Sequence, residues 1–435
     1  MSSLNSNSGV SKRKSVNNFG KKGWAVVLFT LLLYMFSGAV PDTINVTVTA
    51  FAEKFSWDSN AMLSYTGIGG FIGIPVALIF GLIIKKTNVK APTVVLTAIF
   101  AVLWFLNGRV TTIAAYGIIT ILITAVSNTV NLVSTQQIMS NWFPRKKGIA
   151  LGWATMGMPL AGVILVPLFQ VMFGSGISAP FTLMAILTLV LAAIALTWFK
   201  SYPEEAGAYP DNEAISEEDQ KKNMEAMASY KSPFTIKKLF ATKQFWFIII
   251  IFGLLFFTLV GTVSQIVPRL IATGMSSNQA VVMMSVTSAL GIPASYLWGF
   301  IDQKCGTKKS LIYFCIVWIV AMAMSAIGVA IGNIPLSVIS SILAASGLGG
   351  LGNLMPSMEI QVFGRYDFSA ANSLIIPIVV GMRSFSLIAI SSILSAAGAN
   401  VTGGFRNVFI LFTIIAIIVT VFAMAMDDKT IGKLD

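Results

Sequence analysis

A single arginine inside an apolar segment is the residue of this chain best suited to bind a solute. Arg383 is near the midpoint of the run from 370 to 398, and a guanidinium at that depth costs at least a few kcal/mol unless it is paired or faces water. Its planar fork suits carboxylates and other oxyanions. We therefore expect Arg383 to bind an anionic solute. The alternative is a structural ion pair buried between helices.

Asp42 is the one acid well inside the first six apolar runs, and it follows Pro41. Pro41 should bend or break the helix here, because proline lacks a backbone N–H. Three roles remain open for the Asp42 carboxylate: a proton carrier, a standing counter-ion for Arg383, or an acid at the outer mouth of a cavity. Steps of three or four residues place other polar or small residues on the same helical face. These are Tyr34, Gly38, Asn45 and Thr49.

Neutral polar side chains within the apolar runs can orient a solute without adding charge. Asn128 and Asn131 are three residues apart and therefore share a helical face. The alternative for each such residue is a hydrogen bond between helices, commonly worth about 0.6 kcal/mol, or simple packing for an aromatic ring. The candidates for substrate contact are Tyr34, Tyr65, Asn128, Asn131, Gln265 and Asn353.

The residue types give no support to an enzyme. The chain has no histidine, and its two cysteines, Cys305 and Cys315, lack the spacing of a metal or redox site. The glycine cluster from Gly347 to Gly352 lies inside an apolar run, not in the strand-to-helix turn of a dinucleotide site. We expect no cofactor and no metal. With no ATP-binding loop, energy must come from a gradient or from exchange.

Composition predicts that these residues lie in a membrane. The 435 residues are 56% hydrophobic and 11% charged, with a mean hydropathy of +0.82, whereas soluble domains carry about 25% charged residues. Apolar runs long enough to cross a bilayer, roughly 20 residues, follow one another along the chain. They are 24–52, 61–84, 91–108, 112–139, 148–172, 179–199, 244–270, 277–301, 310–331, 334–360, 370–398 and 405–426.

The chain repeats itself. Gly73-Ile74-Pro75 reappears 218 residues later as Gly291-Ile292-Pro293, and Trp142-Phe143-Pro144-Arg145 is echoed by Val362-Phe363-Gly364-Arg365 at an offset of 220. The twelve runs therefore divide into six and six. We expect an all-α membrane protein whose twelve transmembrane helices form two pseudo-symmetric six-helix halves. At the offset of 220, the residue of the first copy that corresponds to Arg383 is Val163, so the arginine is specific to the second copy.

Sorting the basic residues by side of the membrane predicts the topology. Most of the 29 Lys and Arg fall on the side of both termini, whereas the other side carries Lys54, Arg109, Arg269 and Arg406. Positive charge collects on the cytoplasmic side, so both termini should be cytoplasmic in an integral cell (plasma or inner) membrane protein. The net charge of +12 is thus a topology signal, and we expect no nucleic-acid partner.

One long polar stretch separates the halves. Residues 200–243 mix basic and acidic side chains and should form a cytoplasmic linker, a solvated tether whose part from Glu213 to Ala228 can form a surface helix. The expected organisation is an N-terminal tail, a first half, this linker, a second half and a C-terminal tail. Their bounds are 1–22, 23–199, 200–243, 244–426 and 427–435.

Duplicated halves joined by a charged linker resemble the major facilitator superfamily, whose halves are parallel repeats. The stretch from Gly299 to Lys309 resembles that family's loop signature, with Asp302 as its acid and Lys304 as its base. The copy in the first half has Lys85 where the family usually has Asp. The resemblance implies the major facilitator fold, alternating access, and gating roles for Asp302 and Lys304.

Three shorter stretches resemble the monocarboxylate and oxalate:formate porter branch. They are Gly23 to Val27, Asn141 to Gly148 with Arg145, and Phe363 to Arg365. That branch places a basic residue of helix 11 against a substrate carboxylate, which implies this role for Arg383. The branch's second arginine, in helix 8, has no counterpart between Ser285 and Gly291. A monoanion or zwitterion is therefore favoured over a dicarboxylate.

The predicted cytoplasmic gate includes two further charges. Glu359 lies six residues before Arg365, and either a salt bridge between them or plain solvation fits the sequence. Together with Arg145, Asp302 and Lys304, they complete the candidate gating residues.

The sequence favours a secondary transporter of a small organic anion, a monocarboxylate being the best fit, by symport or exchange. The alternative in the same class is a proton-coupled exporter of neutral or cationic amphiphiles that uses Asp42. A receptor or scaffold acting through the linker is the alternative from another class. The expected partners are the anionic solute, the bilayer and, for symport, protons, and we expect a monomer.

Overall fold

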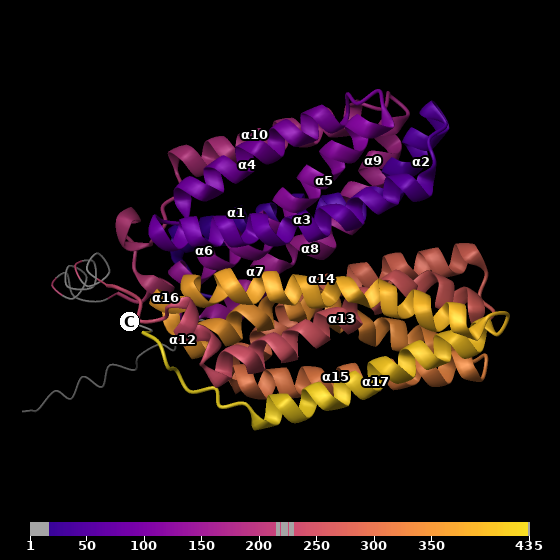
Figure 1. The fold of residues 1–435 in the computed structure, drawn as a ribbon. Coiled ribbons are helices and arrows are strands. Elements are labelled where there is room, and N and C mark those ends of the chain that lie inside the picture. The colour runs from indigo at the N-terminus through magenta and orange to yellow at the C-terminus, as the bar shows by residue number, and fades with distance from the viewer. Residues whose placement is uncertain (1–16, 215–217, 219–224, 226–229, 434–435) are drawn as a thin grey trace, which may run out of the picture.

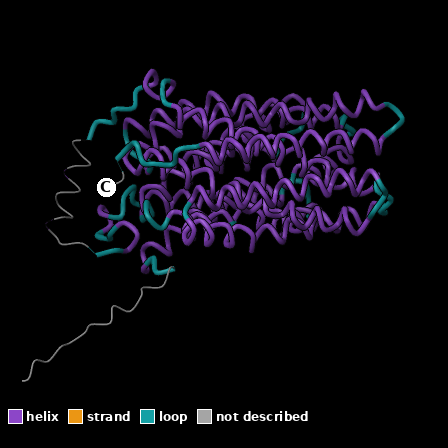
Figure 2. The backbone as a smooth tube through the Cα atoms, turned by 90° about the horizontal axis from the view of Figure 1, so that it is seen from below, coloured by secondary structure: helices purple, strands orange, loops and turns teal. Residues whose placement is uncertain are grey.

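The computed structural model describes residues 17–214, 218, 225 and 230–433, and these fold into helices joined by short turns (Figures 1 and 2). The surface helix expected from Glu213 to Ala228 falls almost wholly outside the described residues. The α-helices of the first half are α1 (Gly20–Asp42), α2 (Ile44–Phe55), α3 (Ser59–Lys86), α4 (Lys90–Asn107), α5 (Ile113–Thr129), α6 (Thr135–Trp142), α7 (Lys147–Thr155), α8 (Gly157–Leu160), α9 (Val166–Phe173) and α10 (Ala179–Thr197).

The second half contains fewer but longer helices. They are α13 (Lys243–Ala272), α14 (Ser277–Cys305), α15 (Thr307–Ala330), α16 (Ile334–Ala397) and α17 (Val401–Ala425). Between the halves lie the single-turn helices η3 (Glu204–Ala206) and η4 (Pro210–Asn212) and the short α12 (Ile236–Phe240). Two π-helical turns, η1 (Val130–Ser134) and η2 (Ala161–Leu165), interrupt the first half.

The expected spans are present. In the described residues, 11 helices are long and apolar enough to cross a membrane. One of them, the 64-residue α16, covers both the 334–360 and the 370–398 runs, and its backbone breaks at Gly364, where φ is 72°. Residues with a Cβ atom rarely adopt a backbone conformation with positive φ, so glycine is suited to this turn. The all-helical membrane fold with six runs in each half is therefore confirmed.

The first span is broken where the sequence indicated. α1 ends at Asp42 and α2 begins at Ile44, with Thr43 between them. Pro41 cannot donate a backbone hydrogen bond, which weakens the helix at this point. The carboxylate of Asp42 therefore lies next to this one-residue interruption.

The two halves form two bundles that lie side by side, with α1–α10 in one and α13–α17 in the other (Figure 1). The helices run along a common direction (Figure 2). We call the end of the molecule where the C-terminus and the segment joining α10 to α13 are found the linker end, and the other end the far end.

Glycines allow the two halves to touch near the linker end. A Cβ on Gly299 of α14 would lie 2.4 Å from the carbonyl oxygen of Gly148 and 2.8 Å from Cα of Gly152, both in α7. A Cβ on Gly81 of α3 would lie 2.8 Å from Cβ of Ser373 in α16. Such distances leave no room for a side chain, so the halves are closed against each other at this level.

The first part of the linker is not the solvated tether that the sequence indicated. Glu204 and Asp211 are buried, and the Nζ of Lys22, at the start of α1, donates a 2.5 Å hydrogen bond to the carbonyl of Ala206. Asp211 accepts hydrogen bonds from the backbone N–H groups of Arg145 and Lys146. This segment is therefore packed onto the first half. The sequence did not reveal this, because its partners lie about sixty residues or more away.

Candidate functional site

Arg383 lies in the second part of α16 with a half-buried side chain, and its guanidinium reaches across to the other half. Its Nη2 donates a hydrogen bond to Oδ1 of Asn128 at 3.3 Å. Asn128 belongs to α5, so this contact joins the two bundles. Within the described residues, no carboxylate forms an ion pair with Arg383. The structural ion pair considered from the sequence is therefore absent there, and most of the guanidinium donors remain available to a ligand or water.

Asn128 is held in place by its own half of the molecule. It lies two residues before the π-helical turn η1 and is half-buried. Gly73 of α3 packs beside it, since a Cβ at Gly73 would lie 3.5 Å from Nδ2 of Asn128. A π-helical turn changes the direction in which neighbouring side chains point and is frequent at functional sites. The amide of Asn128 is thus positioned to meet a group on the facing bundle.

Asp42 faces the region between the halves but does not pair with Arg383. Its side chain is exposed. A Cβ added at Gly162, in the second π-helical turn η2, would lie 3.3 Å from Oδ2 of Asp42 and 4.0 Å from Cβ of Ser288 in α14. No ion pair between Asp42 and Arg383 occurs in the described part of the chain. The counter-ion role therefore gains no support, whereas the proton-carrier and cavity-mouth roles stay open.

Two of the predicted substrate-binding residues instead hold helices together. Asn131 is buried and donates to Oγ of Ser37 at 3.1 Å, which ties α1 to η1. Asn353 is buried in α16 and donates to the carbonyl of Ser295 in α14 at 2.8 Å. In this conformation both residues have the packing role that the sequence left as the alternative.

The other three candidates are Tyr34, Tyr65 and Gln265, and their contacts described below are with residues other than Arg383. Tyr34 is buried where α1 packs on Gly157. Tyr65 is half-buried and packs against Tyr116, with ring centroids 6.5 Å apart. Gln265 is half-buried in α13 and bonds to its neighbour Ser264. Of the seven residues predicted to contact substrate, Arg383 and Asn128 form a hydrogen bond with each other.

Several predicted gating residues meet at the linker end. Asp302 is buried in α14, accepts a 2.5 Å hydrogen bond from Ser357 and lies directly against Gly148 of the other half. Arg145 is exposed, with Glu213 at 3.9 Å, and its carbonyl accepts from Gln303. Lys304 is exposed and lies over the ring of its neighbour Phe300.

The salt bridge between Glu359 and Arg365, one of the two possibilities that the sequence left open, is not formed. Arg365 forms a bidentate salt bridge with Glu204 of the linker, with both N···O distances 2.9 Å and both side chains buried. Glu359 is fully buried, and neither of its oxygens has a hydrogen-bond partner among the described residues. Solvation of Glu359 is therefore wrong as well. The backbone breaks at Gly364, between the two residues, so their spacing along a regular helix does not fix how they lie relative to each other.

Comparison with known proteins agrees with this fold. Residues 31–380 match the Major Facilitator Superfamily. The chain belongs to this superfamily. It is 22% identical over 371 residues to the oxalate:formate antiporter of Oxalobacter formigenes, covering 82% of this chain and 81% of that protein.

Two solved structures show the same fold at low sequence identity. The proton:xylose symporter XylE superposes with a TM-score of 0.69 at 13% identity, covering 94% of this chain and 97% of that one. The E. coli fucose:proton symporter FucP gives a TM-score of 0.67 at 14% identity, covering 92% and 98%. The chain is thus a membrane transporter of the superfamily and not an enzyme.

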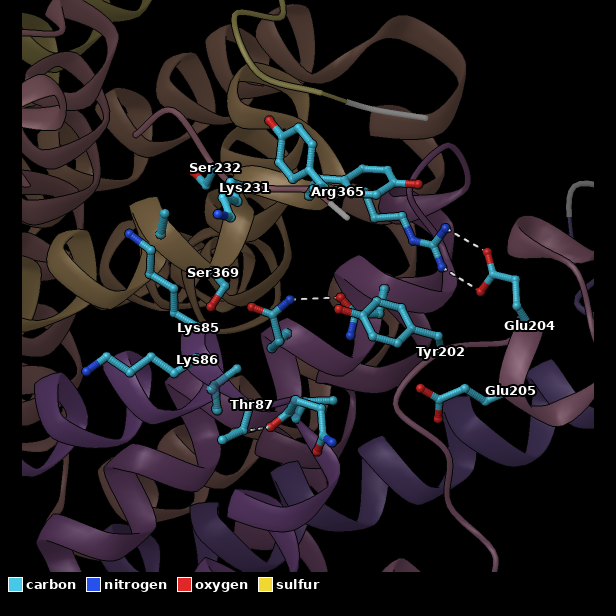
Figure 3. A pocket seen from close by; sticks show the side chains of 18 residues that line it. Lys85, Lys86, Thr87, Tyr202, Glu204, Glu205, Lys231, Ser232, Arg365 and Ser369 are labelled. Carbon is cyan, nitrogen blue, oxygen red and sulfur yellow. Dashed lines mark hydrogen bonds and ion pairs between the residues drawn. The ribbon is translucent and has the colours of Figure 1, made fainter. Parts of the chain in front are cut away.

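The transporter also contains a pocket at its linker end (Figure 3), which we call the linker-end pocket. Its volume is about 620 Å³. It is formed by the end of α3, by α6, by two parts of the linker and by α16 just after Gly364. None of the residues predicted to bind substrate lines it.

One buried charge of the transporter was missed by the sequence analysis. Arg269, which the charge sorting placed outside the membrane, is fully buried. It donates to Oγ of Ser340 at 2.8 Å, to Oγ of Ser341 at 2.6 Å and to the carbonyl of Ser337 at 3.4 Å. The signal available was its position inside the apolar run 244–270.

Proposed function

We propose that this chain is a secondary transporter of a small organic anion, a monocarboxylate being the best fit, with its linker end in the cytoplasm of the cell. The observation that carries the proposal is the hydrogen bond between Arg383 and Asn128, which joins the two halves while no carboxylate pairs with the arginine in the described residues. The oxalate:formate antiporter among its relatives supports an anionic substrate class.

A carboxylate would replace Asn128 as the acceptor. A guanidinium can donate two parallel N–H bonds to one carboxylate, which is a stronger contact than one 3.3 Å bond to a neutral amide. The Nδ2 of Asn128 can then donate to the same solute, so that a bound anion touches both bundles. One positive charge suits one negative charge, and the neutral pair costs less to enclose than either ion alone.

The orientation of the molecule follows from charge. Lys and Arg gather at the linker end, and a cytoplasmic location for such loops is the general rule for membrane proteins. The glycine contacts between α7 and α14 hold that end closed in this conformation. A transport cycle would separate these contacts and close the far end in turn.

The proposal is tested by solute uptake into proteoliposomes. Arg383→Ala should lower uptake of the best monocarboxylate by roughly 10- to 150-fold, which corresponds to a lost charged hydrogen bond of about 1.5–3 kcal/mol, while Arg383→Lys retains weak uptake. Arg406→Ala is the matched control, because Arg406 is exposed near the far end and bonds to its neighbour Asn407. Unimpaired transport by the Arg383→Ala protein would reject the proposal.

The exposed carboxylate of Asp42, facing Gly162 and Ser288, favours a second candidate, a proton-coupled exporter of neutral or cationic amphiphiles. In that case Asp42→Asn should abolish flux driven by a pH gradient, while substrate exchange at equal pH continues. If a pH gradient drives no substrate through the wild-type protein, this candidate is excluded.

A further inference from the structure

The linker-end pocket is large enough for a small ligand, since ligand sites commonly occupy about 300–1,000 Å³ and this one measures about 620 Å³. Its walls come from three parts of the chain. Ile84 to Val89 lie in the first half, Ser369 and Ala370 lie in the second, and Tyr202 and Lys231 belong to the linker. A ligand held here would therefore join three separate segments.

The charges of the pocket are divided between its two sides. Figure 3 shows Lys85 and Lys86 on the side away from Glu204 and Glu205. Lys85, Lys86 and Lys231 are exposed, and in the described residues none of them lies within ion-pair distance of a carboxylate.

The fourth basic group of the lining is already neutralised. Arg365 is occupied by its bidentate bond to Glu204. The uncompensated positive charge therefore belongs to the three lysines.

Other groups of the lining suit an anion with several acceptor oxygens. The hydroxyl groups of Ser232 and Ser369 line the same pocket as the lysines, whereas that of Thr87 already donates to the carbonyl of Ile83. Ammonium groups and hydroxyls are the donors that phosphoryl oxygens accept. Basic pockets between transmembrane helices can bind lipid head groups in the same way.

We propose that the linker-end pocket binds a phosphate-bearing anion through Lys85, Lys86 and Lys231. The ligand is either an anionic phospholipid head group or a soluble phosphate ester, which share this chemistry. Because the pocket joins both halves to the linker, an occupied pocket keeps the linker end closed. This last step rests on the proposed alternating-access function, whereas binding itself does not.

The first test measures thermal unfolding of the purified protein in neutral detergent, with pyrophosphate as the probe. Wild type should show a saturable rise in Tm of about 3 °C or more, and sodium sulfate at the same ionic strength should not reproduce it. The triple variant Lys85→Gln/Lys86→Gln/Lys231→Gln should lose the rise. Glutamine keeps a hydrogen-bond donor and removes the charge.

A matched triple variant controls for net charge. Lys237→Gln/Lys238→Gln/Lys309→Gln removes three exposed lysines that do not line the pocket and should keep the full response. Arg383→Ala should keep it too, so that failure of the substrate-site proposal and failure of this one are distinguishable. Loss of the response in either of these variants would overturn the proposal.

A second arm separates the two sources. Nanodiscs of phosphatidylcholine alone are compared with nanodiscs that also contain phosphatidylglycerol. Stabilisation of wild type but not of the pocket variant by phosphatidylglycerol identifies a head group. A response to pyrophosphate alone identifies a soluble ester. Equal responses of wild type and pocket variant, or no response in either arm, would overturn the site.

The closing effect has its own readout. Where pyrophosphate stabilises the protein, it should lower the rate of substrate exchange by wild type about threefold or more. The reason is that a ligand bound in the closed conformation lowers the fraction of protein that opens at the linker end. Exchange by the pocket variant should be unaffected. Binding without any slowing would overturn the closing role.

Discussion

Arg269 and Arg383 are both at least half-buried inside helices of the second half, and in the described residues neither has an acidic partner. They differ in how completely the protein satisfies them. Arg269 is fully buried, donates to two serine hydroxyls and a carbonyl, and lies 5.0 Å from the centre of the Phe409 ring. Arg383 is half-buried and has one 3.3 Å bond to Asn128 of the other half. Both terminal nitrogens of Arg269 have acceptors in its own half, and its Nε has no partner in the described residues. Arg383 has one bond where the halves meet, so most of its donors are available to a solute.

The largest expected difference concerns stability. Arg269→Ala should lower the free energy of unfolding by roughly 3 kcal/mol, because several charged hydrogen bonds are lost and a cavity remains. Arg383→Ala should lower it by less than about 1 kcal/mol, since one long bond is lost. Denaturant unfolding in detergent, followed by tryptophan fluorescence, measures both. Equal losses for the two variants would break the distinction.

The two asparagines on the facing half sharpen the same distinction. Asn128 bonds to Arg383, whereas Asn131, three residues on, bonds to Ser37 within its own half. Asn128→Ala should raise the KM for the best anion about tenfold, as expected for a hydrogen bond of about 1.4 kcal/mol made to substrate. Asn131→Ala should leave KM unchanged and lower the melting temperature. A larger increase in KM for Asn131→Ala than for Asn128→Ala would indicate that the substrate binds closer to η1.

How far the sequence predicts this arrangement depends on the range of each contact. The apolar runs and the interruption of the first span follow from local pattern, and the structure has both of them. The partner of Arg383 could be named as a candidate but not as a contact, because Asn128 is 255 residues away in sequence.

Burial was the harder property to predict. Sorting charges by side of the membrane says nothing about whether a basic residue faces lipid head groups or serine hydroxyls, so it does not reveal that Arg269 is buried. The linker was read from its composition, which is that of a solvated segment. Its buried acids, Glu204 and Asp211, depend on contacts with Arg365 and the loop before α7 that no local pattern encodes.

The smallest expected effect concerns Asp211, a buried acid of the linker. It tests whether hydrogen bonds from the protein are enough to keep a buried side chain charged. Asp211 accepts hydrogen bonds from the backbone N–H groups of Arg145 and Lys146, yet burial has the larger effect and raises its pKa from 3.8 to about 6. The folded protein therefore binds this proton more tightly than the unfolded chain. Stability from this group is gained as the pH falls through about 6 and is lost as the pH rises above it.

Lowering the pH from 7 to 5 should therefore raise the free energy of unfolding by about 1 kcal/mol through this group. Asp211→Asn keeps the shape and removes the titration, so subtracting its pH profile from that of wild type isolates the contribution of Asp211. Glu205→Gln, at an acid of the same segment that is not buried, serves as the control. A wild-type profile that differs from Asp211→Asn in the opposite direction would mean that the backbone N–H groups outweigh burial, and Asp211 would then resemble Arg269 in being held as an ion by hydrogen bonds from the protein.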